Sequence, residues 1–353
     1  MSQIFISTFS DLQNIRDNLS GNYVLVNDID CTNKVFVPLP IINREGSLDG
    51  NNFKLLNFTT QASSIFDSTG LYSEINNPEY KVKNLHFINV NIIGEYKTGA
   101  LVGCLKNGMV ENVTVNGGLV SGKATIGGVV GENIKGTIMG CSSNANVVGV
   151  FDTCGGFIGK SISGTIKKCF STGNVSLKYG WAGGFVGRFT APNPEDLIEE
   201  CFATGLVTSN FGNYIGGFAG CLDFKGNIKN CFARGNVVGH MYLGGFIGGL
   251  LKTSSGQIIN CYSTGSTKST IDLVKYPKTP LYAGGFCGQQ YSVGCIVNSY
   301  FDSTTAGKTK SWGGFPLNTT QMGFQESFYS WDFNIWSVNG YPYLQNIFFF
   351  NFL

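Results

Sequence analysis

The chain repeats itself at a period close to 28 residues, and this repetition constrains its fold more than any other feature. A Gly-Gly-Phe-x-Gly pentapeptide or a close variant recurs at steps of 28, 28, 28, 33, 28 and 40 residues. Its copies begin at Gly99, Gly127, Gly155, Gly183, Gly216, Gly244 and Gly284. A second motif, I-x-x-C-F/Y, alternates with it and begins at Ile166, Ile198, Ile228 and Ile258, with looser copies at Ile138 and Ile296. Two motifs that recur in phase indicate an array of one structural unit.

Each unit holds two short apolar runs that end at Gly, Asn or Ser, which is the pattern of strands and turns. A unit of two or three strands cannot bury its own apolar face, so neighbouring units must stack. The sequence therefore predicts an all-β fold, a parallel β-helix (solenoid) of about nine coils. A β-propeller is the alternative, although its four-stranded blades usually need repeats of about 40 residues or more.

The two ends of the array differ from its middle. Residues 1–20 are predicted to form an N-terminal capping helix, because Leu12, Ile15 and Leu19 recur at helical spacing after the candidate N-cap residues Ser7, Thr8 and Ser10. Residues 21–98 are interpreted as degenerate leader coils and 99–312 as the regular coils. Residues 313–353 are expected to form an irregular aromatic cap over the last coil and an apolar tail, which tucks into a groove or contacts a second copy.

Stacked coils place equivalent residues in rows along the axis. The third position of the pentapeptide predicts a large apolar row: Leu101, Val129, Phe157, Phe185, Phe218, Phe246 and Phe286. The second motif predicts a row of thiols: Cys141, Cys169, Cys201, Cys231 and Cys261. A free Cys behaves as a small hydrophobe, so we expect these thiols to pack at a tight interior corner. Reactive thiols are the alternative, but no His or basic residue recurs beside them to lower the thiol pKa.

Composition excludes several classes of function. Charged residues are 13% of the chain and the net charge is +2, without the concentrated basic surface of a nucleic-acid binder. No apolar run approaches ~18 residues, so no membrane span is expected. Two His and an odd total of 11 Cys without a C-x-x-C pair predict no metal centre, no cofactor and no disulfide framework. The first 20 residues lack the pattern of a classical signal peptide.

With these motifs the chain resembles the GLUG-repeat proteins, which are bacterial surface and adhesin-like chains. The opening segment Asp11 to Asp30, the closing T-x-x-M run that ends at Met322, W-D-F at Trp331 to Phe333 and Y-P-Y-L at Tyr341 to Leu344 also match that family. The resemblance implies a right-handed parallel β-helix used as a rigid stalk or binding module, with no shared active site. It also implies a cell-surface location, whereas the unpaired cysteines and the missing signal pattern favour an intracellular or virion-associated protein, so the localisation is left open.

The aromatic residues that follow the cysteines of the second motif form the candidate binding site. Successive strand residues point to opposite faces, so an inward Cys row predicts an outward aromatic row. An exposed aromatic stripe is typical of a surface that binds a protein or stacks on a sugar. The alternative is that the row packs beneath a neighbouring segment. The row consists of Phe170, Phe202, Phe232, Tyr262 and Tyr300.

A catalytic site is not expected. Polysaccharide-cleaving β-helix enzymes need paired carboxylates on neighbouring coils. The column after the pentapeptide offers Glu132 beside Lys160 and Arg188, which predicts a surface charge ladder, and Glu199 and Glu200 should point to opposite faces. Other carboxylates considered are Asp28 and Asp30 of the leader and Glu195 and Asp196 of a long loop. The sequence thus predicts a non-enzymatic structural or adhesive module that binds a protein or glycan or self-associates, with a carbohydrate-active enzyme as the alternative.

Overall fold

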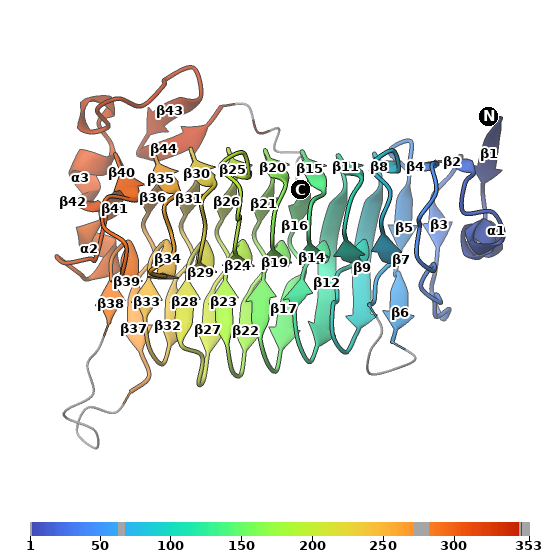
Figure 1. Ribbon diagram of the computed structural model, residues 1–353, viewed down its shortest axis with the longest axis horizontal. Helices are drawn as coiled ribbons and strands as arrows, with labels where there is room; N and C mark the ends of the chain where they lie inside the picture. Colours follow the sequence, from blue (N-terminus) through green and yellow to red (C-terminus); the bar gives the residue numbers. More distant parts are fainter. Residues whose placement is uncertain (1, 63–67, 272–281, 346, 348–353) are drawn as a thin grey trace.

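The computed structural model describes residues 2–62, 68–271, 282–345 and 347. Its strands stack into a β-solenoid of about nine turns, which confirms the predicted all-β parallel fold (Figure 1). Each regular coil contributes one strand to sheet A, two to sheet B, one to sheet D and one to sheet C, in chain order. Strands in these four sheets pair in parallel with the strands of the coils before and after them.

Sheet A contains one strand from each of eleven successive segments. They are β1 (Gln3–Ile6), β2 (Asn22–Leu25), β4 (Ser47–Asp49), β8 (Lys81–Lys83), β11 (Met109–Glu111), β15 (Thr137–Met139), β20 (Thr165–Lys167), β25 (Leu197–Glu199), β30 (Asn227–Lys229), β35 (Gln257–Ile259) and β40 (Ile296–Val297).

Sheet B is bent, and its regular coils each supply two short strands to it. They are β3 (Ile29–Asp30), β5 (Lys54–Leu56), β6 (Thr59–Gln61), β9 (His86–Ile93), β12 (Thr114–Gly122), β16 (Ser142–Ser143), β17 (Asn146–Gly149), β21 (Phe170–Ser171), β22 (Val175–Leu177), β26 (Phe202–Ala203), β27 (Val207–Ser209), β31 (Phe232–Ala233), β32 (Val237–Gly239), β36 (Tyr262–Ser263), β37 (Thr267–Ser269), β41 (Tyr300–Asp302) and β42 (Phe315–Leu317).

Sheets D and C follow each other in every regular coil, joined through the pentapeptide. Sheet D consists of β13 (Ile126–Gly127), β18 (Thr153–Gly155), β23 (Trp181–Gly183), β28 (Tyr214–Gly216), β33 (Leu243–Gly244) and β38 (Ala283–Gly284). Sheet C consists of β7 (Tyr72–Ile75), β10 (Val102–Leu105), β14 (Val130–Asn133), β19 (Ile158–Ser161), β24 (Val186–Phe189), β29 (Ala219–Leu222), β34 (Ile247–Leu250) and β39 (Cys287–Gln290).

The last glycine of each pentapeptide allows sheets C and D to meet backbone to backbone. A Cβ atom on Gly159 would lie 2.6 Å from the Ile126 nitrogen and 2.7 Å from the Gly131 oxygen, so no side chain fits there. The third residue points inward, and the phenylalanines from Phe157 to Phe286 stack at 4.7–5.0 Å between ring centroids. All five of these rings are buried, as are the isoleucines at the start of the second motif from Ile138 to Ile258.

The cysteine row lies in the interior and has a hydrogen-bonding role as well as a packing role. The residue before each Cys has a left-handed backbone, as at Lys168 (φ 54°). The Cys141 N–H donates to Cys169 Sγ at 3.4 Å, and Cys169 donates to Cys201 Sγ in the same way. In the final coil Ser299 Oγ replaces the thiol and accepts from the Cys261 N–H at 3.1 Å. Burial raises the pKa of Cys141 well above its ordinary value, so this thiol is neutral at pH 7.

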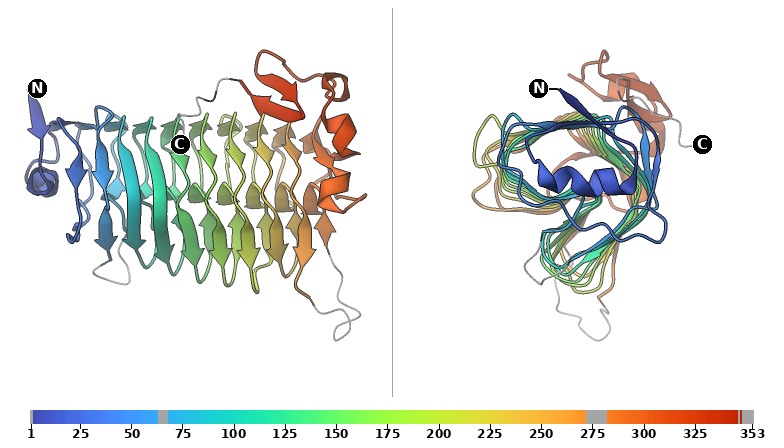
Figure 2. Two further views of the ribbon diagram at one scale, coloured as in Figure 1. Left: turned by 180° about the vertical axis from the view of Figure 1, so that it is seen from behind. Right: turned by 90° about the vertical axis from the view of Figure 1, so that its right-hand side faces the viewer.

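The N-terminal end carries the expected helix, shorter than predicted. Helix α1 (Phe9–Asn14) continues into the 3₁₀ turn η1 (Ile15–Asp17), and Thr8 and Asp11 form a capping box at its start. The helix lies across the open end of the stack (Figure 2). A preceding strand, β1, pairs with β2 and was not predicted, because its residues are mostly exposed and show little apolar alternation.

The C-terminal segment differs from the predicted cap over the last coil. It contains α2 (Ser303–Ala306), α3 (Thr319–Met322), η2 (Gln325–Ser327) and a hairpin of β43 (Trp336–Asn339) and β44 (Tyr341–Leu344). The hairpin runs back along the side of the stack (Figure 1). There Trp336 Nε1 donates to Asn230 Oδ1 at 3.2 Å. Of the apolar tail, Ile347 is described and buried, and residues 348–353 lie outside the described residues.

The thiol column generates a prediction about stability. Replacing Cys169 by Ala removes the acceptor of a buried N–H group, which should lower the free energy of unfolding by about 1–3 kcal/mol. Replacement by Ser should cost less, because a hydroxyl accepts the same hydrogen bond at Ser299. Urea denaturation, together with hydrogen exchange at the Cys141 amide, measures both effects.

The matched control is Cys154→Ala, which removes a buried thiol of sheet D for which no accepted N–H bond is found among the described residues. A Cys169→Ser variant that exchanges the Cys141 amide as fast as Cys169→Ala would contradict the role assigned to sulfur.

Candidate binding surface

The predicted aromatic row points away from the Cys core, as expected, but it is not an exposed stripe. Phe170, Phe202 and Phe232 stack at 4.8 and 4.6 Å between centroids, and Tyr262 and Tyr300 continue the register. All five side chains are buried, at 9% exposure or less. The prediction of exposure is therefore wrong. They form a second apolar cluster with residues of the C-terminal segment: Met322, Phe328, Trp331, Trp336, Leu344 and Ile347.

The C-terminal segment is held on this row by polar contacts as well. Arg234 Nη2 donates to the Pro342 carbonyl at 2.8 Å, and the Arg234 guanidinium lies over the ring of Tyr341 at 5.4 Å. Tyr341 in turn donates to Asp302 Oδ2 at 2.7 Å. The partner of the row in this structure is therefore the chain's own C-terminal segment, and binding of another molecule by these five residues stays a prediction.

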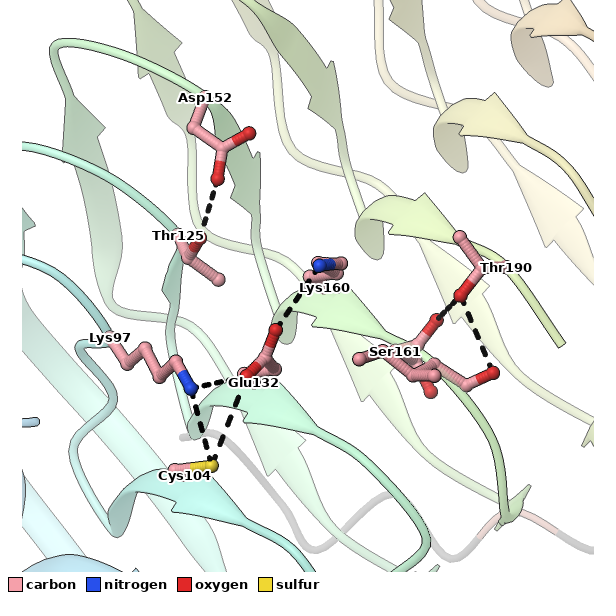
Figure 3. Close-up of polar contacts among 9 residues, drawn as sticks. Lys97, Cys104, Thr125, Glu132, Asp152, Lys160, Ser161 and Thr190 are labelled. Atoms are coloured by element: carbon pink, nitrogen blue, oxygen red, sulfur yellow. Dashed lines mark hydrogen bonds and ion pairs between the residues drawn. The ribbon is translucent and has the colours of Figure 1, made fainter.

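The charge column after the pentapeptide pairs in part as predicted, but its carboxylate is buried and not at the surface (Figure 3). Glu132 is buried and pairs with Lys160 at 3.3 Å, the expected neighbour one coil on. A stronger partner was missed: Lys97 Nζ lies 2.6 Å from Glu132 Oε2. Lys97 lies just before the pentapeptide that begins at Gly99 and belongs to neither motif. Its contact with Glu132 depends on how sheet D meets sheet C, which the sequence pattern does not show. Arg188 leaves the charge column and its guanidinium lies 4.7 Å from the ring centre of Trp181.

Glu132, Lys97 and Lys160, called here the Glu132 cluster, form a structural ion-pair network. Burial alone would raise the pKa of Glu132, but Lys97 and Lys160 outweigh it and hold the pKa below its ordinary value of 4.5. Cys104 Sγ lies 3.7 Å from Lys97 Nζ. Burial nevertheless raises the pKa of Cys104 to about 11, so the thiol is protonated at pH 7 and is not an activated nucleophile.

The other candidate carboxylates lie apart from this cluster. Asp196 is buried and accepts from the backbone N–H groups of Gly164 at 2.8 Å and Asn193 at 2.9 Å, so it closes a turn. Asp28 and Asp30 of the leader and Glu195 are exposed. The loop 252–283 lies partly outside the described residues.

Glu199 and Glu200 do not alternate as predicted. Glu199 Oε2 pairs with Lys167 at 2.8 Å, and Glu200 Oε2 lies 3.9 Å from Lys168, so both side chains meet lysines of the preceding coil. The cause is the left-handed backbone of Glu200 (φ 52°), which interrupts the strand alternation. In the described part of the chain, no three His, Cys, Asp or Glu side chains gather as a metal site requires.

An exposed aromatic surface does exist, at the turn between sheets B and D. Phe151, Tyr179 and Phe211, called here the outer ladder, are 52%, 39% and 52% exposed. Their rings stack on successive coils, with centroids 5.7 and 5.3 Å apart. The sequence signal was available, because Phe151 and Tyr179 each lie four residues before a Gly-Gly pair, but these positions fall outside both motifs.

A second row, called here the inner ladder, lies beside the first at the start of the sheet D strands. It consists of Trp181, Tyr214, Tyr242 and Tyr282, all half-buried. Tyr214 and Tyr242 stack at 4.8 Å, Tyr242 and Tyr282 at 5.0 Å, and Trp181 is tilted against Tyr214 at 6.5 Å. The two ladders together give the regular coils a broad aromatic edge.

The Glu132 cluster generates a prediction about pH. Glu132→Gln leaves two ammonium groups without their anion, so at pH 7 the free energy of unfolding should fall by roughly 1–3 kcal/mol, between the values for exposed and buried pairs. The pKa of Glu132 is lower in the folded chain than in the unfolded chain. The ion pair therefore adds to the free energy of unfolding above about pH 4.5, and this contribution is lost as the pH falls through the folded pKa. Urea denaturation from pH 3 to 7 measures this effect. The difference in free energy of unfolding between Glu132→Gln and wild type should become smaller below about pH 4.5.

Glu199→Gln is the control, because its pair with Lys167 is partly exposed and should contribute about 1 kcal/mol or less. Two results would contradict the role of Glu132 as the anion of a buried ion pair. One is an equal loss of stability in both variants, and the other is a loss of stability in Glu132→Gln that stays the same at pH 3.

Comparison with known proteins supports the fold. A candidate immunoglobulin A1 protease from Bacteroides ovatus superimposes with a TM-score of 0.56 at 21% identity, covering 98% of this chain and 92% of that one. A second structure, named IgA1 protease, gives a TM-score of 0.52 at 18% identity over 84% of this chain and 21% of its own length. At these identities the likeness shows the fold alone. The names nevertheless contradict the sequence-based prediction of a chain that is not an enzyme, and that prediction is withdrawn.

A curated relative is also found. A candidate Gly-rich membrane protein of Evansella cellulosilytica is 30% identical over 126 residues, which are 34% of this chain and 14% of that protein, so the chain spans about a seventh of its relative's length. Among the helices of the described residues, none is long and apolar enough to cross a membrane. The GLUG motif matches residues 211–238 and 239–268, two consecutive coils. The GLUG motif that the sequence resembles is therefore confirmed in these two coils of the β-solenoid.

Proposed function

We propose that this β-helix is a protein-binding module whose ligand lies along the outer and inner ladders. The observation that carries the proposal is the exposure of the outer ladder. Its three side chains, Phe151, Tyr179 and Phe211, are 39–52% exposed and form one continuous row. Aromatic side chains are enriched in protein interfaces, and tyrosine and tryptophan are frequent among the few residues that carry most of the binding energy. The rings are already ordered by stacking, so little conformational entropy is lost when a ligand covers them.

The stacking geometry favours a protein over a sugar as the ligand of the ladders. The parallel rings of the outer ladder are 5.3–5.7 Å apart and form offset stacks. Its middle ring, Tyr179, therefore has a neighbouring ring on each face. Ring edges and the tyrosine hydroxyl are left toward solvent. A pyranose needs a free ring face for its C–H groups, whereas apolar and hydrogen-bonding groups of a protein use edges and hydroxyls equally well.

The named solved structures suggest the first ligand to test. Both are named for immunoglobulin A1, and the part that superimposes on this chain is 21% of the longer one. We therefore propose immunoglobulin A1 as the ligand class of this module. Cleavage of the bound protein is a second candidate function, which the same names favour. The samples of the binding experiment can also be tested for cleavage.

The test replaces the outer ladder. The double variant Tyr179→Ser with Phe211→Ser should weaken binding of immunoglobulin A1 at least about tenfold, since interface aromatics typically contribute more than 1 kcal/mol each. Biolayer interferometry measures the affinity, and electrophoresis of the incubated immunoglobulin detects any cleavage. Thermal unfolding should be nearly unchanged, because both side chains are at the surface.

The matched control is Phe5→Ser with Phe324→Ser, which removes two exposed rings (63% and 55%) elsewhere on the chain. It should bind as wild type does. Equal binding by the ladder variant and wild type would exclude the ladder as the site, and absence of binding by wild type would exclude this ligand.

A further inference from the structure

The two ends of the inner ladder differ in what covers the terminal ring. At the first end, the guanidinium of Arg188 lies over Trp181 at 4.7 Å. At the other end, Tyr282 has Tyr242 on one face at 5.0 Å, and within the described residues no other ring stacks on it. Tyr282 precedes β38, the edge strand of sheet D, so the regular stack of rings ends there.

A cavity opens at this free end. Its volume is about 470 Å³, within the ~300–1,000 Å³ of small-ligand sites. Its walls are Tyr282, Ala283, Gly284, Lys310, Ser311 and Trp312. The Lys310 carbonyl accepts from the Gly285 N–H at 3.3 Å, so the segment with Lys310 and Trp312 is fixed beside the end of sheet D.

The polar and apolar groups of this cavity divide into clear roles. Trp312 is 54% exposed and offers an indole beside the free end of the ladder. Lys310 is exposed, and no ion pair of its ammonium is found among the described residues. Ser311 Oγ is already engaged with the N–H groups of Phe286 and Cys287 at 3.1 and 2.8 Å. The charged group available to a ligand is therefore the Lys310 ammonium, in a cavity that Tyr282 and Trp312 also line.

We propose that this cavity binds a pyranose ring that carries a carboxylate, that is, an acidic sugar unit. The C–H face of the pyranose packs on Tyr282 and Trp312, because aromatic rings with a free face bury apolar C–H groups and leave hydroxyls to water. The carboxylate pairs with Lys310. The site shares Tyr282 with the inner ladder but uses the face of that ring on which no other described ring stacks. It does not rest on the protein surface proposed above, because the ladders would bind their ligand through ring edges.

Methyl glucuronide and methyl glucoside are the matched probes, since they differ only in the carboxylate. Titration of the wild-type chain, followed by the indole N–H signal that Trp312→Ala removes, should show the glucuronide binding about two- to fivefold more tightly at low salt, as an exposed ion pair predicts. Lys310→Ala should bring the ratio to about one. Lys308→Ala, a neighbouring cation that does not line the cavity, should keep the wild-type ratio.

Trp312→Ala should weaken both sugars at least about threefold, detected by ligand-observed saturation transfer. Thermal unfolding of each variant confirms that the fold is kept. No binding of either sugar, equal binding of the two by wild type, or an unchanged preference in Lys310→Ala would each overturn the proposal. Loss of immunoglobulin binding in the outer-ladder variant with sugar binding retained would show that the two sites are independent.

Discussion

The structure depends on the backbone hydrogen bonds between coils, which join each residue to its equivalent in the next coil. A parallel ladder in constant register, such as Ile138 to Ile166 to Ile198, turns every sequence repeat into a row along the axis. The close contact of sheets C and D, which only glycine permits, keeps the shape of each coil the same and so preserves the register. Interior rows of Phe, Ile and Cys and the surface ladders of aromatics follow from this one constraint.

The same constraint explains how rows of aromatic side chains form at the surface without long loops. A residue type that recurs once per coil becomes a continuous stripe, and the turn between sheets B and D supplies Phe151, Tyr179 and Phe211 in this way. Where the inner ladder ends, at Tyr282, a cavity opens that is lined by Lys310 as well as by aromatic side chains. Repetition thus produces an extended aromatic surface, and the end of the repetition leaves a local cavity.

The sequence predicted the fold and the interior rows because both motifs describe buried positions, where packing leaves little choice. It predicted that the row from Phe170 to Tyr300 is exposed, because this row follows the strand alternation outward, but the C-terminal segment covers it. Contacts of that kind have no local signal. Lys97, whose contact with Glu132 depends on how two sheets meet, and Glu200, whose left-handed backbone breaks the alternation, were missed for related reasons.

The hairpin has a consequence for how the solenoid loses its structure. A stack in which each coil contacts only its neighbours frays from its ends, one coil at a time. Here Trp336 contacts Asn230, Arg234 contacts Pro342 and Trp331 contacts Asn298, so one segment ties together coils that are separated along the axis. Those coils must open as one cooperative unit. Fraying should therefore start at the N-terminal end, where α1 and β1 contact the first coils only.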